Sequence, residues 1–210
     1  MLGCLALRES RLEIALMTSN ENRPPCLYLL WPRQTRDVPE ALVPEGYNLR
    51  VYRDGDALQF LDLQSKDGEP MNDHQWRHYL DALLPNGLFL VTHVKSTRLV
   101  GTAGAIHNPN PGRYYFPFGG ELGYLIVAPD HRRLGLGRAV CAAVVKRLLS
   151  AGYENIRVCV QEHRLAAIGT YLRLGFEPFL HSAQVKERWR RVYEAMNLEF
   201  TPKSWPRAVE

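Results

Sequence analysis

The chain has 210 residues, and 26 Lys and Arg against 22 Asp and Glu give a formal net charge of +4. A hydrophobic content of 46% and a charged content of 23% are globular values, and the length suffices for one domain with a substantial core. Such a mild basic excess is no argument for nucleic acid, and no apolar run reaches the ~18 residues that a membrane span needs.

Residues 1–46 differ from the remainder of the chain. Two short apolar segments, residues 12–17 and 26–31, are candidate strands, and Asn and Pro residues separate and follow them. We interpret this stretch as an N-terminal extension that packs on the domain or is partly mobile, because it is too short for a core of its own. The first ten residues lack a basic segment, so no secretory signal is predicted and a soluble cytoplasmic protein is expected.

From Tyr47 the pattern becomes regular and predicts a main domain over residues 47–200. Strands are predicted over 47–52, 88–94, 99–106, 124–127, 156–160 and 176–180. One helix starts after Asp56, and a second is capped by Asp73 and ended by Pro85-Asn86-Gly87. Three more helices are predicted from near Arg138 to Gly152, over 165–174 and over 184–196. Strands in tandem followed by strand–helix–strand–helix predict an α/β fold, a mixed sheet with helices on both faces. Residues 201–210 are expected to form a loose tail.

The stretch over residues 122–138 is the most informative part of the chain. A buried strand, 124–127, leads into a basic loop that contains Gly135 and Gly137, and a helix follows from about Arg138. A strand, a glycine loop and a helix in this order point unpaired backbone N–H groups at a phosphate. The stretch therefore predicts a binding site for a phosphate-bearing ligand.

A second motif lies in the helix over 165–174, where Tyr171 stands four residues before Gly175-Phe176. Together with Arg132-x-x-Gly135-x-Gly137, and with a helix and a strand between the two, this order resembles the GNAT superfamily of acyl-CoA-dependent N-acyltransferases. The resemblance covers residues 47–180. It implies a GNAT-like mixed, mostly antiparallel central sheet with helices on both faces and a splayed parallel strand pair at the cofactor site.

The resemblance also implies acetyl-CoA as co-substrate and no metal. Its pyrophosphate would bind at the loop and its pantetheine arm along the strand edge, the binding residues being Leu125, Ile126, Val127, Arg132, Arg133, Leu134, Gly135, Leu136, Gly137 and Arg138. A dinucleotide site is the alternative for such a loop. It is disfavoured because Val140 takes the place of the third glycine and Gln161 that of the acidic residue.

Tyr171 is the predicted general acid toward the departing thiolate, since a thiol pKa near ~8.5 and a tyrosine pKa near ~10 are almost matched. A packed aromatic residue is the alternative. Glu121 is the candidate base, because its place sixteen residues before Gly137 resembles that of the base in the histone-acetyltransferase branch. The alternatives are a solvated carboxylate at the strand end and His107 as the base.

Two positions depart from the family pattern. Cys159 stands where other members carry a carboxylate, and Arg164 replaces an asparagine. The leading function is acetyl transfer from acetyl-CoA to a primary amine of a small molecule or peptide, by direct attack in a ternary complex. The rival is a degenerate GNAT-like domain that binds acyl-CoA as a ligand or sensor. The aromatic residues of segment 108–120 either line an acceptor pocket or pack in the core or between subunits, and a homodimer is left open.

The remaining polar features predict no further site. The cysteines, at positions 4, 26, 141 and 159, form no CxxC pair, so neither a zinc site nor a disulfide framework is predicted, and Cys141 and Cys159 are expected as core thiols. His74 and His78 lack the glutamate of HExxH and are read as a surface pair. Residues 186–191 are read as a solvated helix face with Trp189 turned inward, so no nucleic-acid or membrane partner is expected.

Overall fold

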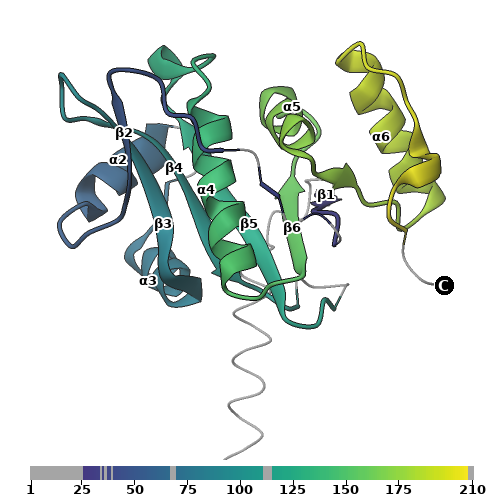
Figure 1. The fold of residues 1–210 in the computed structure, drawn as a ribbon, viewed down its shortest axis with the longest axis horizontal. Helices are drawn as coiled ribbons and strands as arrows, with labels where there is room; N and C mark the ends of the chain where they lie inside the picture. The colour runs from purple at the N-terminus through teal and green to yellow at the C-terminus, as the bar shows by residue number, and fades with distance from the viewer. Residues whose placement is uncertain are drawn as a thin grey trace, which may run out of the picture.

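The computed structural model describes residues 26–33, 35, 37, 38, 40–66, 70–110 and 115–207. The strands in this part of the chain are β1 (Leu27–Leu30), β2 (Tyr47–Val51), β3 (Leu83–His93), β4 (Leu99–His107), β5 (Gly119–Val127), β6 (Asn155–Val160) and β7 (Glu177–Pro178). The helices are α2 (Ala57–Lys66), α3 (Asp73–Ala82), α4 (Leu136–Ser150), α5 (Leu165–Leu174) and α6 (Ala183–Ala195), with short 3-10 turns η1 (Pro129–His131) and η2 (Pro202–Ser204) (Figure 1).

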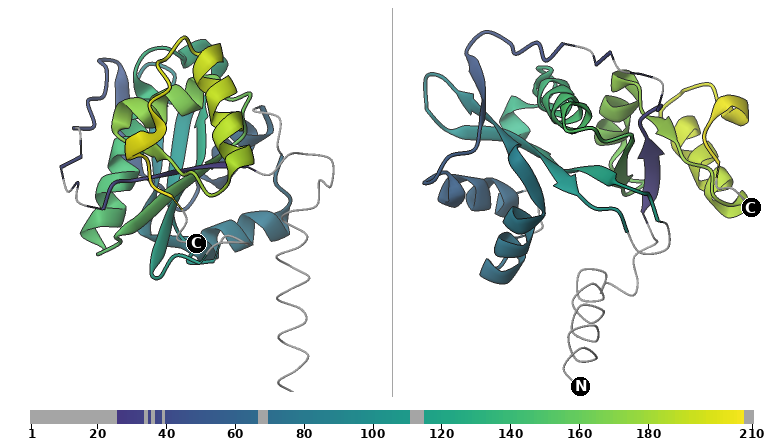
Figure 2. Two further views of the ribbon diagram at one scale, coloured as in Figure 1. Left: turned by 90° about the vertical axis from the view of Figure 1, so that its right-hand side faces the viewer. Right: turned by 60° about the horizontal axis from the view of Figure 1, so that its bottom comes forward.

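All described strands belong to one sheet of order β2-β3-β4-β5-β6-β1-β7. Every neighbouring pair is antiparallel except β5 and β6, which are parallel. Helices α4 and α5 cover one face of the sheet, and α2 and α3 cover the other (Figure 2). The predicted fold class, a mixed and mostly antiparallel sheet with helices on both faces and one parallel pair, is confirmed.

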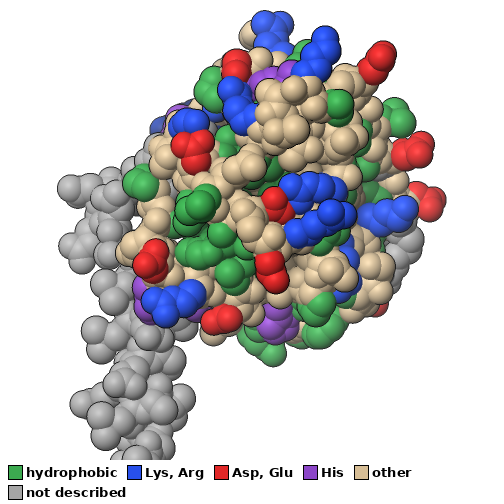
Figure 3. Space-filling model, turned by 90° about the vertical axis from the view of Figure 1, so that its left-hand side faces the viewer, with side chains coloured by type: hydrophobic (Ala, Val, Ile, Leu, Met, Phe, Trp, Pro, Cys, Tyr) green, Lys and Arg blue, Asp and Glu red, His purple; other side chains and the backbone are tan. Residues whose placement is uncertain are grey.

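The core follows from the apolar faces of the helices. Helix α4 buries Val140, Val144 and Leu148 completely against the sheet, whereas Phe60 and Tyr79 pack on the opposite face. None of the described helices is both long and apolar enough to cross a membrane. Basic and acidic side chains are interspersed on the face shown in Figure 3, as the small net charge implies.

Strand β1, which falls within the predicted N-terminal extension, lies inside the sheet between β6 and β7. Its pairing with β6 brings Cys26 and Cys159 to a Cα–Cα distance of 5.6 Å, and the two form a disulfide. The prediction of a core thiol at Cys159, with no disulfide, was therefore wrong. The pairing joins residues 133 positions apart, and neither spacing nor composition reveals it. Cys141 is a buried free thiol, as predicted. Cys4 and the candidate strand over 12–17 lie outside the described residues.

The start of helix α3 and the strand that follows it differ from the prediction. Asn72, not Asp73, is the N-cap, and it forms a capping box with Gln75. Pro85-Asn86-Gly87 does not form a connecting turn after the helix but lies within β3, which begins at Leu83. A register shift between Leu83 and Leu88, with Asn86 at φ 56°, lets these turn-forming residues stand in the strand as a bulge.

The C-terminal segment was expected to be loose, and its described part is packed instead. Trp205 is 8% exposed, and its ring lies 4.9 Å from Tyr193 and 5.2 Å from Phe200 between centroids. Leu180 also pairs with Arg207 through an isolated parallel bridge. Burial of these aromatic side chains gives the segment the apolar contact that a free tail would lack.

Candidate functional site

Strands β5 and β6 diverge after a short parallel stretch. Their pairing runs from Gly119 opposite Asn155 to Glu121 opposite Arg157, while β5 stays paired with β4 as far as Val127. Within the described strands, residues 122–127 therefore have no strand partner on the β6 side. We call this divergence the opening, and the Glu121–Arg157 pair its vertex. The splayed parallel pair that the resemblance implies is present here.

A bulge shapes β5 where it borders the opening. The register with β4 shifts between Thr102 and Gly104, and Tyr124 has a φ of 54°. The Tyr124 ring packs on Tyr79 at 4.2 Å between centroids, and a Cβ on Gly104 would lie only 2.1 Å from the Tyr79 hydroxyl oxygen. Glycine at position 104 therefore makes room for Tyr79, and the bulge redirects the backbone groups of β5 beside the opening.

The glycine loop connects β5 to α4. Gly135, with a φ of 85°, is the N-cap of α4, so the helix begins at Leu136, two residues before the predicted start. Leu136 is 1% exposed and anchors the first turn in the core, whereas Arg132, Arg133 and the other loop residues are exposed. Among the described residues no side chain caps this helix terminus, so its first N–H groups are available to an anion.

Gly137 marks the place where the loop, β5 and α5 meet. A Cβ added at Gly137 would lie 3.6 Å from Val127 Cγ2 and 3.9 Å from both Leu125 Cδ1 and Thr170 Cγ2. The structure thus brings the predicted loop residues beside the predicted strand edge. Ile126 belongs to the same edge, but its side chain is only 4% exposed, so a ligand would reach it through its backbone.

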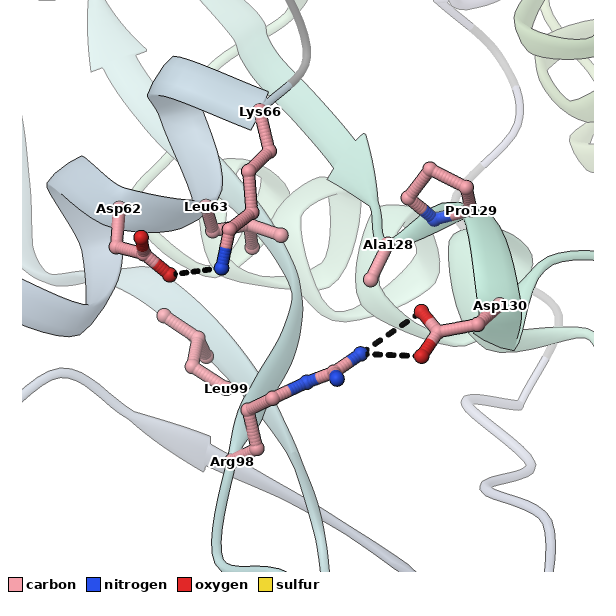
Figure 4. Close-up of a pocket in the computed structure, with 8 residues that line it drawn as sticks. All are labelled: Asp62, Leu63, Lys66, Arg98, Leu99, Ala128, Pro129 and Asp130. Atoms are coloured by element: carbon pink, nitrogen blue, oxygen red, sulfur yellow. Dashed lines mark hydrogen bonds and ion pairs between the residues drawn. The ribbon is translucent and has the colours of Figure 1, made fainter.

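Contacts from β2 and from the β3–β4 turn fix the start of the loop. Arg98 binds both carboxylate oxygens of Asp130 at 2.7 Å (Figure 4), which lowers the pKa of Asp130. The Tyr47 hydroxyl lies 2.7 Å from His131 Nδ1, and Arg132 Nε donates to the Val127 carbonyl at 3.0 Å. Lys66 and Arg98 line a small pocket beside Asp130. Lys66 is paired with Asp62 and Arg98 with Asp130, so both positive side chains of the pocket already have partners (Figure 4).

Successive residues of β5 point to opposite faces at the vertex. A Cβ on Gly120 would meet Leu148 of α4, and one on Gly119 would meet Arg157 Nη1 at 2.9 Å. Glu121 therefore points away from α4, toward the side of Arg157. His107, opposite Gly120, bonds the Tyr153 hydroxyl at 2.7 Å on the α4 side. The alternative base thus lies on the other face from Glu121.

Glu121 is held by two donors and is not the solvated strand-end carboxylate of the alternative interpretation. Asn108 Nδ2 donates to Glu121 Oε2 at 2.9 Å, and Arg157 Nη2 lies 3.2 Å from the same oxygen. The Glu121 side chain is 18% exposed. Burial raises its pKa, and the charge of Arg157 and the hydrogen bonds oppose that rise.

Arg157 also belongs to the candidate site, although it was not predicted from the sequence. It is 0% exposed, Nη2 also donates to the Asn108 carbonyl, and its guanidinium lies 5.1 Å from the centre of the Phe116 ring. The sequence does show an arginine between Ile156 and Val158 in an otherwise apolar strand, which is unusual. That observation does not identify a site residue unless it is also known that Glu121 lies opposite.

Tyr171 is 5% exposed and lies on α5, which ends at Gly175 with a φ of 114°, the left-handed terminus that the Gly-Phe motif predicts. Burial raises the pKa of Tyr171 well above its usual value, with smaller contributions that include Cys141 and Glu121. This shift moves the pKa of Tyr171 away from that of a thiol, opposite to the tuning that the reference values called for. Arg164, the second departure from the family pattern, is the N-cap of α5.

The aromatic segment before β5 does not gather into one pocket over its described part. Phe116 packs beside Arg157, whereas Phe118 stacks on Tyr153 at 4.3 Å between centroids. Tyr115 is 70% exposed, and Tyr114 lies outside the described residues. No group of His, Cys, Asp and Glu among the described residues could hold a metal ion, and His74 and His78 are exposed.

Comparisons with known proteins agree with this architecture. The profile of the acetyltransferase (GNAT) family matches residues 52–176. A mycothiol acetyltransferase of Amycolatopsis mediterranei is 28% identical over 177 residues, covering 78% of this chain and 57% of the relative, and one of Rhodococcus opacus is 30% identical, covering 73% and 53%. The chain thus spans about half the length of these curated relatives.

Solved structures show the same fold. A GCN5-related N-acetyltransferase from Sphaerobacter thermophilus superposes with a TM-score of 0.60 at 19% identity, over 78% of this chain and 52% of that one. The family profile covers more than half of the sequence, and the sheet carries the parallel pair that the resemblance implies. The chain therefore belongs to the GNAT acetyltransferase family.

Proposed function

We propose that this protein is an N-acetyltransferase that transfers the acetyl group of acetyl-CoA to a primary amine of a small molecule or peptide, by direct attack in a ternary complex. The observation that carries the proposal is the opening itself. Among the described residues, the β5 edge beyond Glu121 has no strand partner on the β6 side, and α4 starts beside it with no side-chain cap. Glu121 stands at the end of the paired stretch, and Tyr171 on α5 is close enough to interact with it electrostatically.

The residues around the loop fit the phosphates of a coenzyme A donor. Gly135 adopts the left-handed conformation that starts α4, and the helix dipole adds positive potential at the same N–H groups. Arg132, Arg133 and Arg138 are exposed next to them and supply charge. The edge at residues 125–127 offers backbone groups to the amides of a pantetheine arm, as an added strand would use them.

Glu121 and Tyr171 supply the two proton transfers of the reaction. The Glu121 carboxylate takes a proton from the acceptor ammonium or amine, the C–N bond forms as the C–S bond breaks, and the Tyr171 hydroxyl gives its proton to the departing sulfur. The raised pKa of Tyr171 keeps the phenol protonated at neutral pH, which is the state that an acid requires. A backbone N–H near the Tyr124 bulge supports the charge that develops on the thioester oxygen.

Binding of acyl-CoA without transfer is the second candidate. It is favoured by Cys159, which stands where other members have a carboxylate and is tied to Cys26 in a disulfide, so that it offers no acid or base. The placement of Arg164 at the N-cap of α5 adds a second departure. Both candidates use the same loop, so donor binding alone does not distinguish them.

Release of coenzyme A thiol from acetyl-CoA, measured against a panel of amines, amino sugars, amino acids and peptide N-termini, separates the two. We expect turnover with at least one class. Tyr171→Phe should lower that rate by about 10²–10⁴-fold while acetyl-CoA still binds. Tyr193→Phe is the matched control, since Tyr193 is a buried tyrosine on α6. Donor binding without turnover on the whole panel would favour the non-catalytic candidate.

A further inference from the structure

The vertex of the opening is closed by an ion pair. Glu121 and Arg157 are the last residues of β5 and β6 that face each other in the parallel register, and their side chains meet with 3.2 Å between Glu121 Oε2 and Arg157 Nη2. Among the described strands, the residues of β5 after Glu121 have no partner on the β6 side. The pair therefore joins the two strands at the point where they separate, and it places the carboxylate at the closed end of the opening.

Asn108 completes this arrangement from the segment after β4. Its backbone N–H donates to the Gly119 carbonyl at 3.0 Å, which fixes the segment beside the vertex. Its side-chain amide donates to Glu121 Oε2, and its carbonyl accepts from Arg157. Among the described residues both donors reach Oε2, so Oε1 is the oxygen left for an incoming proton.

The surroundings of Arg157 indicate that Glu121 is the reason for its burial. The arginine is 0% exposed, and among the described residues its Nε and Nη1 have no hydrogen-bond partner. An arginine buried for structural reasons normally uses most of its five N–H donors, because an unmade bond in the core is costly. Here the guanidinium has one carboxylate within ion-pair distance in the described structure, and Phe116 covers it.

We propose that Arg157, with Asn108, is a positioning residue that holds the Glu121 carboxylate ionised at the vertex and ready to take the proton of the acceptor amine. This inference rests on the proposed function, because it takes Glu121 as the base. Arg157 contacts the carboxylate and leaves the proton transfer itself to Glu121.

The groups around Glu121 set the direction of the expected effect. Asn108 faces it from the segment after β4 and Arg157 from β6, Tyr171 on α5 is coupled to it electrostatically, and Tyr28 on β1 acts on Arg157. Burial raises the pKa of Glu121, and Arg157 and Asn108 lower it. Without Arg157 the pKa rises further, so the active carboxylate form is lost at a higher pH and the acidic limb of activity moves upward.

The first test is the pH dependence of kcat/KM in Arg157→Gln, Arg157→Lys and Asn108→Ala. In Arg157→Gln, kcat/KM near neutral pH should fall by about tenfold or more relative to wild type, and most of it should return at alkaline pH. Arg157→Lys keeps the charge and should retain most of the wild-type profile. Arg50→Gln removes the guanidinium of another Arg–carboxylate pair, on β2, and should leave the acidic limb in place. An equal loss at every pH in Arg157→Gln would overturn the proposal.

A second readout does not depend on turnover. The Glu121 carboxyl is titrated by NMR in protein with ¹³C-labelled glutamate, and Glu121→Gln identifies its signal. The titration should move to higher pH in Arg157→Gln, and in the same direction but less in Asn108→Ala. If Arg157→Gln fails to fold by circular dichroism, Arg157→Lys and Asn108→Ala decide, and an unchanged titration in Asn108→Ala overturns the proposal.

The two readouts keep the two proposals apart. A wild-type protein that transfers acetyl to no amine on the panel, but whose Glu121 titration moves as expected, would refute the proposed function and leave the positioning role intact. A wild-type enzyme with turnover whose Glu121 titrates identically in wild type and Arg157→Gln would refute the positioning role alone.

Discussion

The two ends of the opening, the glycine loop and the vertex, differ in the kind of group that they present. At the loop end the proposed binding groups are mainly backbone N–H groups, held by the left-handed conformation of Gly135 and the start of α4, with exposed arginines beside them. At the vertex they are side chains from three separate segments, Asn108, Glu121 and Arg157, and two of these carry charge in a largely buried place. The loop end therefore depends on backbone conformation, and the vertex depends on which side chains are present.

Loss of the Glu121 carboxylate should give the largest effect, and it should change the acetyl-transfer rate without changing donor binding at the loop end. In Glu121→Gln we expect the acetyl-transfer rate to drop by about 10²–10⁴-fold, because the variant lacks the proposed base, while acetyl-CoA affinity stays at the wild-type value. Steady-state kinetics and calorimetric titration measure the two quantities. Asp56→Asn, which removes the carboxylate paired with Arg50, is the matched control. A large loss of donor affinity in Glu121→Gln would contradict this comparison, because it would show that the vertex also contributes to donor binding.

The same division explains what the sequence could and could not predict. The loop end was predictable because its determinants are local: glycines at fixed spacing after a buried strand and before a helix. The fold class followed from the same kind of local periodicity. At the loop end the helix start was misplaced, since Leu136 begins α4 and buries its side chain before the exposed Arg138.

The vertex could not be predicted because its partners meet only through strand register. Arg157 stands 36 residues after Glu121 in the sequence, and nothing local to either residue reveals that they face each other. The disulfide between Cys26 and Cys159 escaped for the same reason, since it depends on the antiparallel pairing of β1 with β6. Side chains far apart in the sequence can be predicted to meet only after the order and register of the strands are known.

The disulfide is the next test, and it concerns the β6 side of the opening. A crosslink between residues 133 positions apart restricts the unfolded chain, so Cys26→Ser with Cys159→Ser should lower the free energy of unfolding by about 2–4 kcal/mol. Reductant should lower the Tm of the wild type and leave that of the double variant unchanged. Cys141→Ser, which removes the free buried thiol, is the control for the reductant response. Donor affinity should not change, because the glycine loop connects β5 to α4, whereas the disulfide joins the residue just before β1 to β6.

A smaller effect is expected from Gly135→Ala, which strains the loop end alone. An alanine at a φ of 85° costs about 1–2 kcal/mol, so the loop shifts or the helix start weakens and acetyl-CoA should bind about 5–30-fold less tightly. Gly152→Ala is a close match, since Gly152 has the same φ of 85° and, like Gly135, has no atom of the described residues within 4 Å of an added Cβ. Both variants should lose similar stability, and Gly135→Ala alone should lose donor affinity.

The smallest effect should come from the contact that tethers the loop to the β3–β4 turn. Arg98→Gln breaks the ion pair with Asp130, and because both side chains are exposed, the change in acetyl-CoA affinity should stay within about threefold. Salt screens such a pair, so the difference between wild type and variant should shrink as the ionic strength rises. Tyr47→Phe removes the neighbouring contact to His131, which salt does not screen, and its effect should persist. A loss of acetyl-CoA affinity in Arg98→Gln as large as that in Gly135→Ala would mean that side-chain contacts, and not backbone conformation alone, determine donor binding at the loop end.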